Sequence, residues 1–234
     1  FIAIALQRGA AATFSARSVR ELELAVAGFE GVDVPTVIWV PDTEAALTAW
    51  GSAARHRLGD VVVGITGSVG KTTTKDLAAA ALGGRFRTHA SLRSFNIEIG
   101  VPLTLLGAPD GTEATVVEMG ARGKGHIAIL CQVARPTIAV VTAVEEVHTE
   151  LFGSIREVAS AKAELVEALP AHGTAILNAA NPLVLGMAER TVADVVTFGA
   201  PDADVVAEHV ELDHDLRARF TLRSPWGSAQ LLVP

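Results

Sequence analysis

Short apolar runs alternate with helix-forming stretches along most of the chain. The β-branched run 61–66 lies between glycine-containing turns, which is typical of a strand buried in a parallel sheet. The same pattern predicts strands at 114–118, 137–143, 173–178 and 195–198, and helices at 71–82, 126–133, 155–169 and 182–190. Because helices separate these strands, we expect an α/β fold with a mostly parallel sheet and helices on both faces.

The two ends of the chain follow other patterns. Residues 55–60 form a polar join, and before it we expect strands at 1–6 and 36–40 and a helix at 43–54. Near the C-terminus, apolar and polar residues alternate, which predicts strands at 205–212, 217–224 and 228–233. Short turns join these strands, so we expect an antiparallel addition to one edge of the sheet. Residues 1–59 are thus predicted to be a smaller α/β portion and residues 60–234 a central domain.

Composition excludes several classes of protein. Half of the 234 residues are apolar and 19% are charged, so a large core can form and a disordered chain is excluded. No apolar run reaches the roughly 18 residues that cross a bilayer, and no export signal is visible, so we expect a soluble, cytoplasmic protein. The single cysteine, Cys131, excludes a disulfide framework and a cysteine-based zinc site. A formal net charge of −7 argues against broad nucleic-acid binding.

The clearest chemical signal is GITGSVGKTTT at residues 64–74, between a predicted strand and a predicted helix. Its glycines depart from the common phosphate-loop spacing, but Gly67 and Gly70 still let backbone N–H groups turn around phosphate oxygens. Lys71 would bring its charge to the β- and γ-phosphates, and the Thr72 hydroxyl would ligate Mg²⁺. The alternative is a glycine turn that only links a strand to a helix. The nucleotide-binding residues expected from this loop are Gly67, Ser68, Val69, Gly70, Lys71, Thr72 and Thr73.

Polar residues elsewhere in the chain allow two interpretations each. Glu118 ends a predicted strand, at the edge where open α/β sheets bind ligands, and would hold Mg²⁺ unless it is a solvated loop residue. Asn178 also ends a strand, where its amide would meet an adenine edge or form an Asx turn. By pattern alone, His148 is a surface or structural histidine and Lys162 a solvated helix residue.

Taken together, the motifs resemble those of the Mur ligases, ATP-dependent enzymes that form amide bonds in peptidoglycan synthesis. The phosphate loop has the glycine spacing of that family. Further similar blocks follow in the family's order: SFNIEIGVPLTLL at 94–106, EMGARGKGHI at 118–127, EEVHTELFGS at 145–154, AKAE at 161–164 and ILNAANP at 176–182. Within the family they most resemble the member that adds D-alanyl-D-alanine to UDP-MurNAc-tripeptide. The alternatives are another Mur-type or folylpolyglutamate-type ligase, or a P-loop NTPase of a different class.

The resemblance implies roles for individual residues. Thr72 and Glu118 would hold Mg²⁺, and His148 would bind a second Mg²⁺ ion. Lys162 would react with CO₂ to give a carbamate that also ligates metal, a reaction that needs an amine made neutral by burial. The residues implied in catalysis are Lys71, His148 and Lys162, and those implied in nucleotide binding beyond the loop are Asn96 and Asn178.

The resemblance also implies the reaction and the domain arrangement. The γ-phosphoryl group of ATP would pass to a substrate carboxylate, and an amine would attack the resulting acyl phosphate. Residues 1–59 would be part of a UDP-sugar-binding domain and residues 60–234 an incomplete ATP-binding domain, with the C-terminal amino-acid-binding domain absent. The expected partners are small molecules, UDP-MurNAc-peptide and D-alanyl-D-alanine, with no nucleic acid and no membrane insertion. We expect a monomer.

Overall fold

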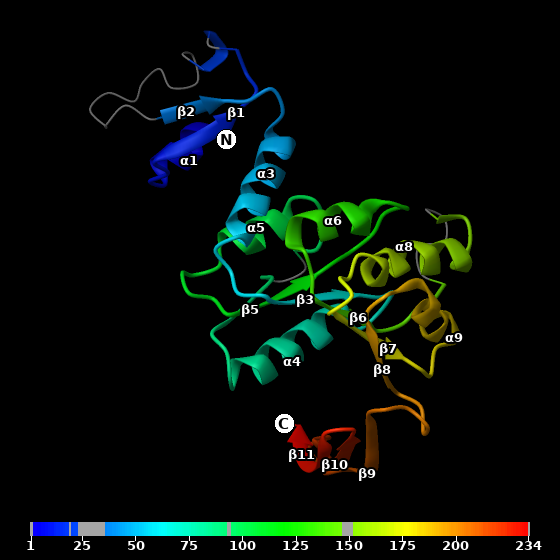
Figure 1. The fold of residues 1–234 in the computed structure, drawn as a ribbon. Helices are drawn as coiled ribbons and strands as arrows, with labels where there is room; N and C mark the ends of the chain where they lie inside the picture. The colour runs from blue at the N-terminus through cyan, green and yellow to red at the C-terminus, as the bar shows by residue number, and fades with distance from the viewer. Residues whose placement is uncertain (1, 19, 23–35, 93–94, 147–151, 234) are drawn as a thin grey trace.

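A six-stranded parallel sheet forms the centre of the protein (Figure 1). The computed structural model describes residues 2–18, 20–22, 36–92, 95–146 and 152–233. The strand order is β4-β5-β3-β6-β7-β8, and every neighbouring pair is parallel. The mostly parallel sheet predicted from the sequence is therefore confirmed. The strands are β3 Val61–Thr66, β4 Thr88–Ala90, β5 Ala114–Glu118, β6 Ile138–Val141, β7 Thr174–Asn178 and β8 Asp194–Phe198.

Helices cover both faces of this sheet (Figure 1). Helix α4, Lys71–Gly83, lies on one face, where Val63, Ile65 and Val116 pack against its apolar side. The opposite face packs against the other helices of the domain and holds the larger core, which includes Val62 and Val117. Those helices are α5 Gly100–Leu106, α6 His126–Ala134 and α8 Ile155–Glu167, followed later in the chain by α9 Pro182–Leu185 and a 3₁₀ turn at Gly186–Arg190.

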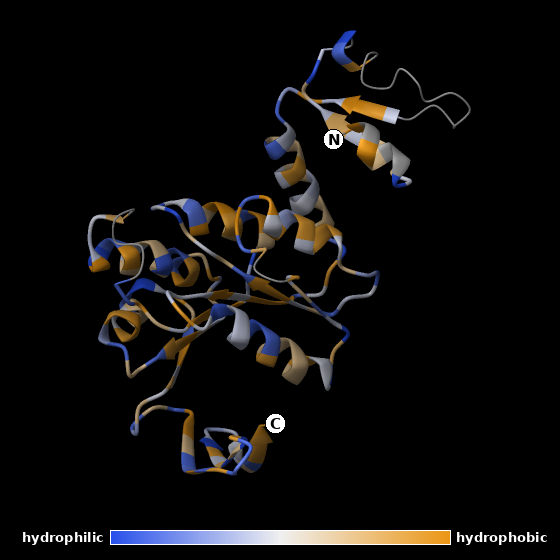
Figure 2. Cartoon of the chain, turned by 180° about the vertical axis from the view of Figure 1, so that it is seen from behind, coloured by the Kyte–Doolittle hydropathy of each residue, from blue (hydrophilic) through white to orange (hydrophobic). Residues whose placement is uncertain are grey.

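The double covering explains the composition of the strands. Figure 2 shows the strands of the central sheet as largely hydrophobic, whereas the helices are mixed. In β3, Val62 faces one core and Val63 the other, so consecutive residues are both apolar. No helix among the described residues is long and apolar enough to cross a bilayer.

The N-terminal portion differs from the prediction in two elements, a helix in place of the first strand and an additional strand at Ala12–Ser15 that the sequence pattern did not predict. Residues 2–7 form helix α1, Ile2–Gln7, instead of the strand expected at 1–6. A run this short does not distinguish a strand from a helix by its periodicity, and its alanine and leucine favour the helix. Strands β1, Ala12–Ser15, and β2, Thr36–Trp39, pair in parallel.

Helix α3, Thr43–Arg55, connects this portion to the central domain. Its N-cap Asp42 accepts hydrogen bonds from the N–H groups of Glu44 and Ala45, and the helix packs against α5 and α6. At its end, the buried Arg55 donates from Nε to the Ala134 carbonyl at the end of α6, at 2.9 Å. The connecting helix is thereby fixed to the domain that carries the phosphate loop.

The C-terminal strands form a sheet of their own. They are β9 Val206–Leu212, β10 Ala218–Ser224 and β11 Gly227–Val233, and both pairs are antiparallel, as predicted. They do not extend the edge of the central sheet, however, because after β8 only one bridge, between Phe198 and Val205, continues the pairing. The Asp204 carboxylate accepts hydrogen bonds from the N–H and hydroxyl of Thr197, and this turn directs the chain away from the edge.

Candidate nucleotide-binding site

The phosphate loop is held in a shape that requires glycine. Gly67 and Gly70 have φ angles of +152° and +81°, which L side chains rarely adopt. A Cβ atom on Gly67 would overlap the Thr142 hydroxyl. That hydroxyl donates to the Val69 carbonyl at 2.6 Å, and the Ser68 N–H donates to the Ala143 carbonyl at 2.7 Å. The segment after β6 therefore fixes the loop from outside.

Lys71 begins helix α4, as predicted, and its side chain turns back over the loop. Its Nζ donates to the carbonyl oxygens of Gly67 at 2.8 Å and Ser68 at 3.2 Å. Partial burial lowers the pKa of Lys71, and the nearby Glu118 opposes that effect. Even so, the ammonium group stands at the mouth of a helix N-terminus, the place that favours a bound anion.

Thr72 and Glu118 meet at the same point, as a shared metal site requires. The Thr72 hydroxyl donates to Glu118 Oε2 at 2.9 Å, and the Asn96 amide donates to Glu118 Oε1 at 2.7 Å. Glu118 is 1% exposed, so it is not the solvated glutamate of the alternative interpretation. In the described part of the chain, no three His, Cys, Asp or Glu side chains cluster as metal ligands. A cation here would thus draw its protein ligands from a hydroxyl and one carboxylate, which suits Mg²⁺ with phosphate oxygens.

Lys162 lies on α8 with its side chain 7% exposed. Burial lowers its pKa to about 8, and the charge of Lys71 adds to the effect. No described residue forms a hydrogen bond or ion pair with its Nζ. The buried setting that was expected to favour a neutral amine is confirmed, while the carbamate itself stays a prediction.

Lys71, Asn96 and Lys162 line a pocket of about 420 Å³ at the carboxyl ends of the strands, and Asn96 joins it to the Thr72–Glu118 pair. Its charged lining residues are Lys71, Arg122 and Lys162, all cations, so the pocket is suited to a polyanion. Sequence reasoning missed Arg122 and Phe152, although Arg122 follows Glu118 by four positions in a block already singled out. The lining residues are Gly67, Ser68, Lys71, Asn96, Ile97, Gly120, Ala121, Arg122, Phe152, Val158 and Lys162.

The other predicted site residues have different outcomes. His148 lies outside the described residues. Thr73 is exposed on the first turn of α4, and the Val69 side chain is exposed. The Asn178 amide donates to the Thr142 carbonyl at 2.8 Å and accepts from the Ala180 N–H at 3.0 Å, which is the Asx turn of the alternative interpretation. Its contact with adenine stays a prediction.

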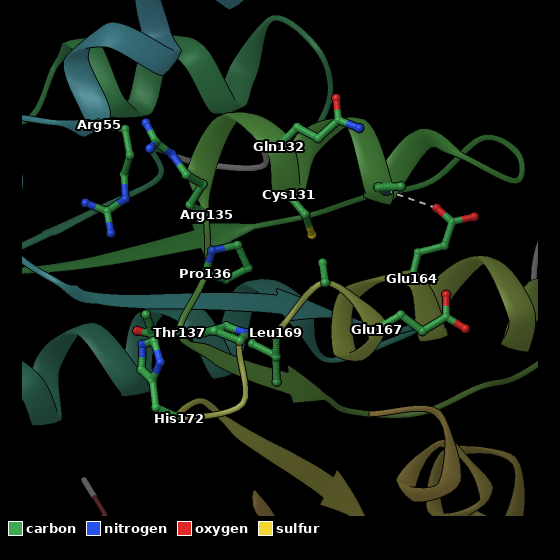
Figure 3. A pocket seen from close by; sticks show the side chains of 13 residues that line it. Arg55, Cys131, Gln132, Arg135, Pro136, Thr137, Glu164, Glu167, Leu169 and His172 are labelled. Atoms are coloured by element: carbon green, nitrogen blue, oxygen red, sulfur yellow. Dashed lines mark hydrogen bonds between the residues drawn. The ribbon is translucent and has the colours of Figure 1, made fainter. Parts of the chain in front are cut away.

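A larger pocket of about 660 Å³ opens at the opposite, amino ends of the strands (Figure 3). The Cys131 sulfur borders it, and burial raises the pKa of this thiol to about 12, so it carries no thiolate near neutral pH. Glu164 lines the same pocket, but its carboxylate accepts hydrogen bonds from the N–H groups of Gly125 and Ala128. This carboxylate therefore stabilises the fold through hydrogen bonds to the backbone.

Comparison with known proteins identifies the family of the chain. Residues 65–234 match the model of the Mur ligase middle domain. The UDP-N-acetylmuramoyl-tripeptide--D-alanyl-D-alanine ligase of Synechocystis is 40% identical over 206 residues, 88% of this chain and 43% of the relative. MurF from Acinetobacter baumannii superposes with a TM-score of 0.82 at 26% identity, over 95% of this chain and 52% of that chain. MurF from Thermotoga maritima, solved in complex with ADP, gives a TM-score of 0.79 at 25% identity, over 97% and 50% of the two chains.

The chain spans about half the length of the relatives it matches. The family model covers most of the chain and includes the phosphate loop from Ile65, the carboxylate Glu118 and the buried Lys162. The described site and the match therefore concern the same residues. By this match, the chain belongs to the Mur ligase family.

Proposed function

We propose that the chain is the nucleotide-binding part of an ATP-dependent ligase that joins UDP-MurNAc-tripeptide to D-alanyl-D-alanine. The observation that carries this proposal is the convergence of Lys71, Thr72 and Glu118 at the phosphate loop. The names of the relatives supply the substrate pair. Residues 1–59 would belong to a UDP-sugar-binding domain, and a further domain would bind the dipeptide. We propose a monomer that acts in the cytoplasm, where ATP is available.

The residues of the loop account for the first chemical step. Backbone N–H groups at residues 67–71 would bind the β- and γ-phosphates, and the Lys71 ammonium would neutralise charge on the transferring phosphoryl group. A carboxylate oxygen of the UDP-sugar peptide attacks the γ-phosphorus, and the bond from that phosphorus to the β-γ bridging oxygen breaks to release ADP. The amine of the dipeptide then attacks the acyl carbon, loses a proton, and displaces phosphate. If both reactants are bound side by side, positioning would supply much of the rate.

The described residues fit Mg²⁺ at this loop. The Thr72 hydroxyl and the Glu118 carboxylate would hold one ion, and Asn96 keeps the carboxylate oriented. His148 would hold a second ion. When bound, Mg²⁺ neutralises phosphate charge and aligns the phosphoryl group for transfer.

Lys162 fits the proposed carbamate. Its neutral amine would attack CO₂ and lose a proton, which leaves a carboxylate-like group on Nζ. The positive charge of Lys71 lies close enough to affect its ionisation, and the same charge would stabilise a carbamate anion. This modification would convert the cation on α8 into a ligand for metal.

The proposal is tested with the full reading frame that contains this chain. The protein is incubated with Mg·ATP, UDP-MurNAc-tripeptide and D-alanyl-D-alanine, and the products are identified by mass spectrometry. We expect UDP-MurNAc-pentapeptide with equal amounts of ADP and phosphate. Ligation of a different amino acid in place of the dipeptide would support a sister ligase. ATP turnover that is independent of both substrates would overturn the ligase and favour an NTPase.

A further inference from the structure

The loop after β5, residues 120–125, presents a cation to the nucleotide pocket. It contains three glycines and two basic residues, and Arg122 lines the pocket together with Lys71 and Lys162. Within the described parts of the chain, Arg122 forms no hydrogen bond or ion pair. The side chain is exposed and its five donors are free for a ligand.

The loop is held at both ends. At its start, the Gly120 N–H donates to the Asn96 carbonyl at 2.6 Å, and Ala121 packs against the larger core. At its end, the Gly125 N–H donates to Glu164 Oε1 at 2.5 Å, and the Ala128 N–H donates to Oε2 at 3.0 Å. The backbone that carries Arg122 therefore has a defined position.

Glu164 makes the second of these attachments from another helix. It lies on α8 and is 8% exposed, and Figure 3 shows its carboxylate directed at the start of α6. The N-cap of α6 is Gly125, which has no side chain to satisfy the first N–H groups, so Glu164 takes that role. A carboxylate is favoured at a helix N-terminus by the helix dipole. Glu164 therefore sets the loop with Arg122 relative to the helix with Lys162.

From this geometry we infer that Arg122 binds the phosphoryl group during transfer, and that Glu164 is a positioning residue that acts through Arg122. The inference rests on the proposed function, because it assumes phosphoryl transfer in this pocket. A guanidinium group binds two phosphoryl oxygens at once, whereas the point charge of a lysine does not. In the transition state, negative charge is spread over the three equatorial oxygens of the transferring phosphoryl group, so a fixed guanidinium group that binds two of them contributes most there.

The test is a double-mutant cycle in the full-length protein. The variants are R122A, R122K, E164Q and R122A/E164Q. The matched controls are K124A, an exposed cation of the same loop, and E167Q, which lies on the same helix and pairs with Arg190. We expect R122A to lower kcat by about 100-fold, R122K to recover little of it, and both controls to stay near wild type. E164Q should lower kcat by about 10-fold alone and have no further effect in the R122A background.

A binding measurement supplements the kinetics. Calorimetry with ADP alone should give similar Kd values for wild type and R122A, whereas ADP with aluminium fluoride, a mimic of the transferring phosphoryl group, should bind R122A about 100-fold more weakly. Thermal unfolding checks that each variant folds, and E164D replaces E164Q if the latter does not.

The outcomes separate this inference from the proposed function. Wild-type activity in R122A, or equal binding of the aluminium fluoride complex, would overturn the role of Arg122. Additive losses in the double variant would overturn the positioning role of Glu164. A wild-type protein that binds ADP but ligates nothing would instead overturn the proposed function.

Discussion

Two pockets lie at opposite ends of the same parallel strands, and both border α6 or α8. The pocket at the amino ends is larger, about 660 Å³ against about 420 Å³ at the carboxyl ends. Of these two, size favours the pocket at the amino ends as the functional site. The charged lining residues favour the smaller pocket as the functional site, because three of them are cations and none is acidic.

In the larger pocket the charged groups are already satisfied. Arg55 donates to the carbonyls of Leu58, Gly59 and Ala134, and Glu167 pairs with Arg190. In the smaller pocket, the hydrogen-bond partners of the Lys71 ammonium among the described residues are loop carbonyls, which a phosphate group can replace. The volume of a pocket thus indicates where a ligand fits, whereas charged side chains without a protein partner indicate the charge of that ligand.

The largest expected effect comes from the central cation of the smaller pocket. We expect K71A to lower kcat by about 1,000-fold, because the transferring phosphoryl group loses its main counter-charge. The control is R135A, which removes a cation from the rim of the larger pocket. Steady-state kinetics of the full-length protein measure both. A larger loss in R135A than in K71A would reverse the assignment of the two pockets.

The next effect concerns the shape of the phosphate loop. G67A should lower the free energy of unfolding by about 2 kcal/mol, because it combines a strained φ with an overlap at Thr142. G83A is the matched control, since its Cβ atom meets open space at the end of α4, and it should stabilise by about 0.5–1 kcal/mol. Urea unfolding measures both changes. Equal stability of G67A and wild type would show that the loop does not need glycine at this position.

The pH dependence of ligation tests Lys162. Its pKa is lowered to about 8, so the neutral fraction rises from about one tenth at pH 7 to about one half at pH 8. At a fixed, limiting concentration of dissolved CO₂, the rate at which CO₂-depleted enzyme regains activity should follow this fraction and rise about fivefold over that interval. Added bicarbonate should restore activity to CO₂-depleted enzyme, and K162A should not respond. A rate that is independent of bicarbonate would contradict the carbamate.

The lowered pKa of Lys162 also predicts the direction in which the free energy of unfolding changes with pH. The folded protein binds fewer protons at Lys162 than the unfolded chain, so this group makes the free energy of unfolding rise as pH increases above about 8. K162M should remove that rise and be more stable than wild type at pH 7. Urea unfolding at pH 7 and pH 9 measures the difference. A rise of the same size in K162M would assign it to other groups.

The smallest effect is expected at the larger pocket. Cys131 is the single cysteine of the chain and burial raises its pKa to about 12, so a thiol reagent should label it only after unfolding. Labelling with and without urea, followed by absorbance, measures this. Fast labelling of the folded protein would show a reactive thiol and reopen the question of function there.

The sequence predicted the central strands better than the edges. The predicted bounds of β3 and β5 agree with the structure, because strands covered on both faces are continuous apolar runs. Strand β4, Thr88–Ala90, was missed since it has three residues at the edge of the sheet. The separate sheet of β9–β11 depends on a turn around Asp204 that strand patterns do not encode.

The residues of the site also fall into those that the sequence predicted and those that it did not. Lys71 and Thr72 are neighbours in a motif, and Glu118 follows from the rule that ligands bind at the carboxyl ends of parallel strands. The attachment of Gly125 by Glu164 joins residues 39 positions apart, and periodicity carries no information about such a contact. The Asx turn between Asn178 and Ala180 was one of the two interpretations of that residue, whereas the hydrogen bond from the Asn178 amide to the Thr142 carbonyl depends on the pairing of β6 with β7.

The central claim is that the nucleotide occupies the smaller pocket. A crystal structure of the full-length protein with Mg·ADP tests it most directly. We expect the β-phosphate within the loop 67–72 beside Lys71, a metal ion at Thr72 and Glu118, and the pocket beside Cys131 empty of nucleotide. Phosphates bound away from the loop, or a nucleotide beside Cys131, would contradict the account.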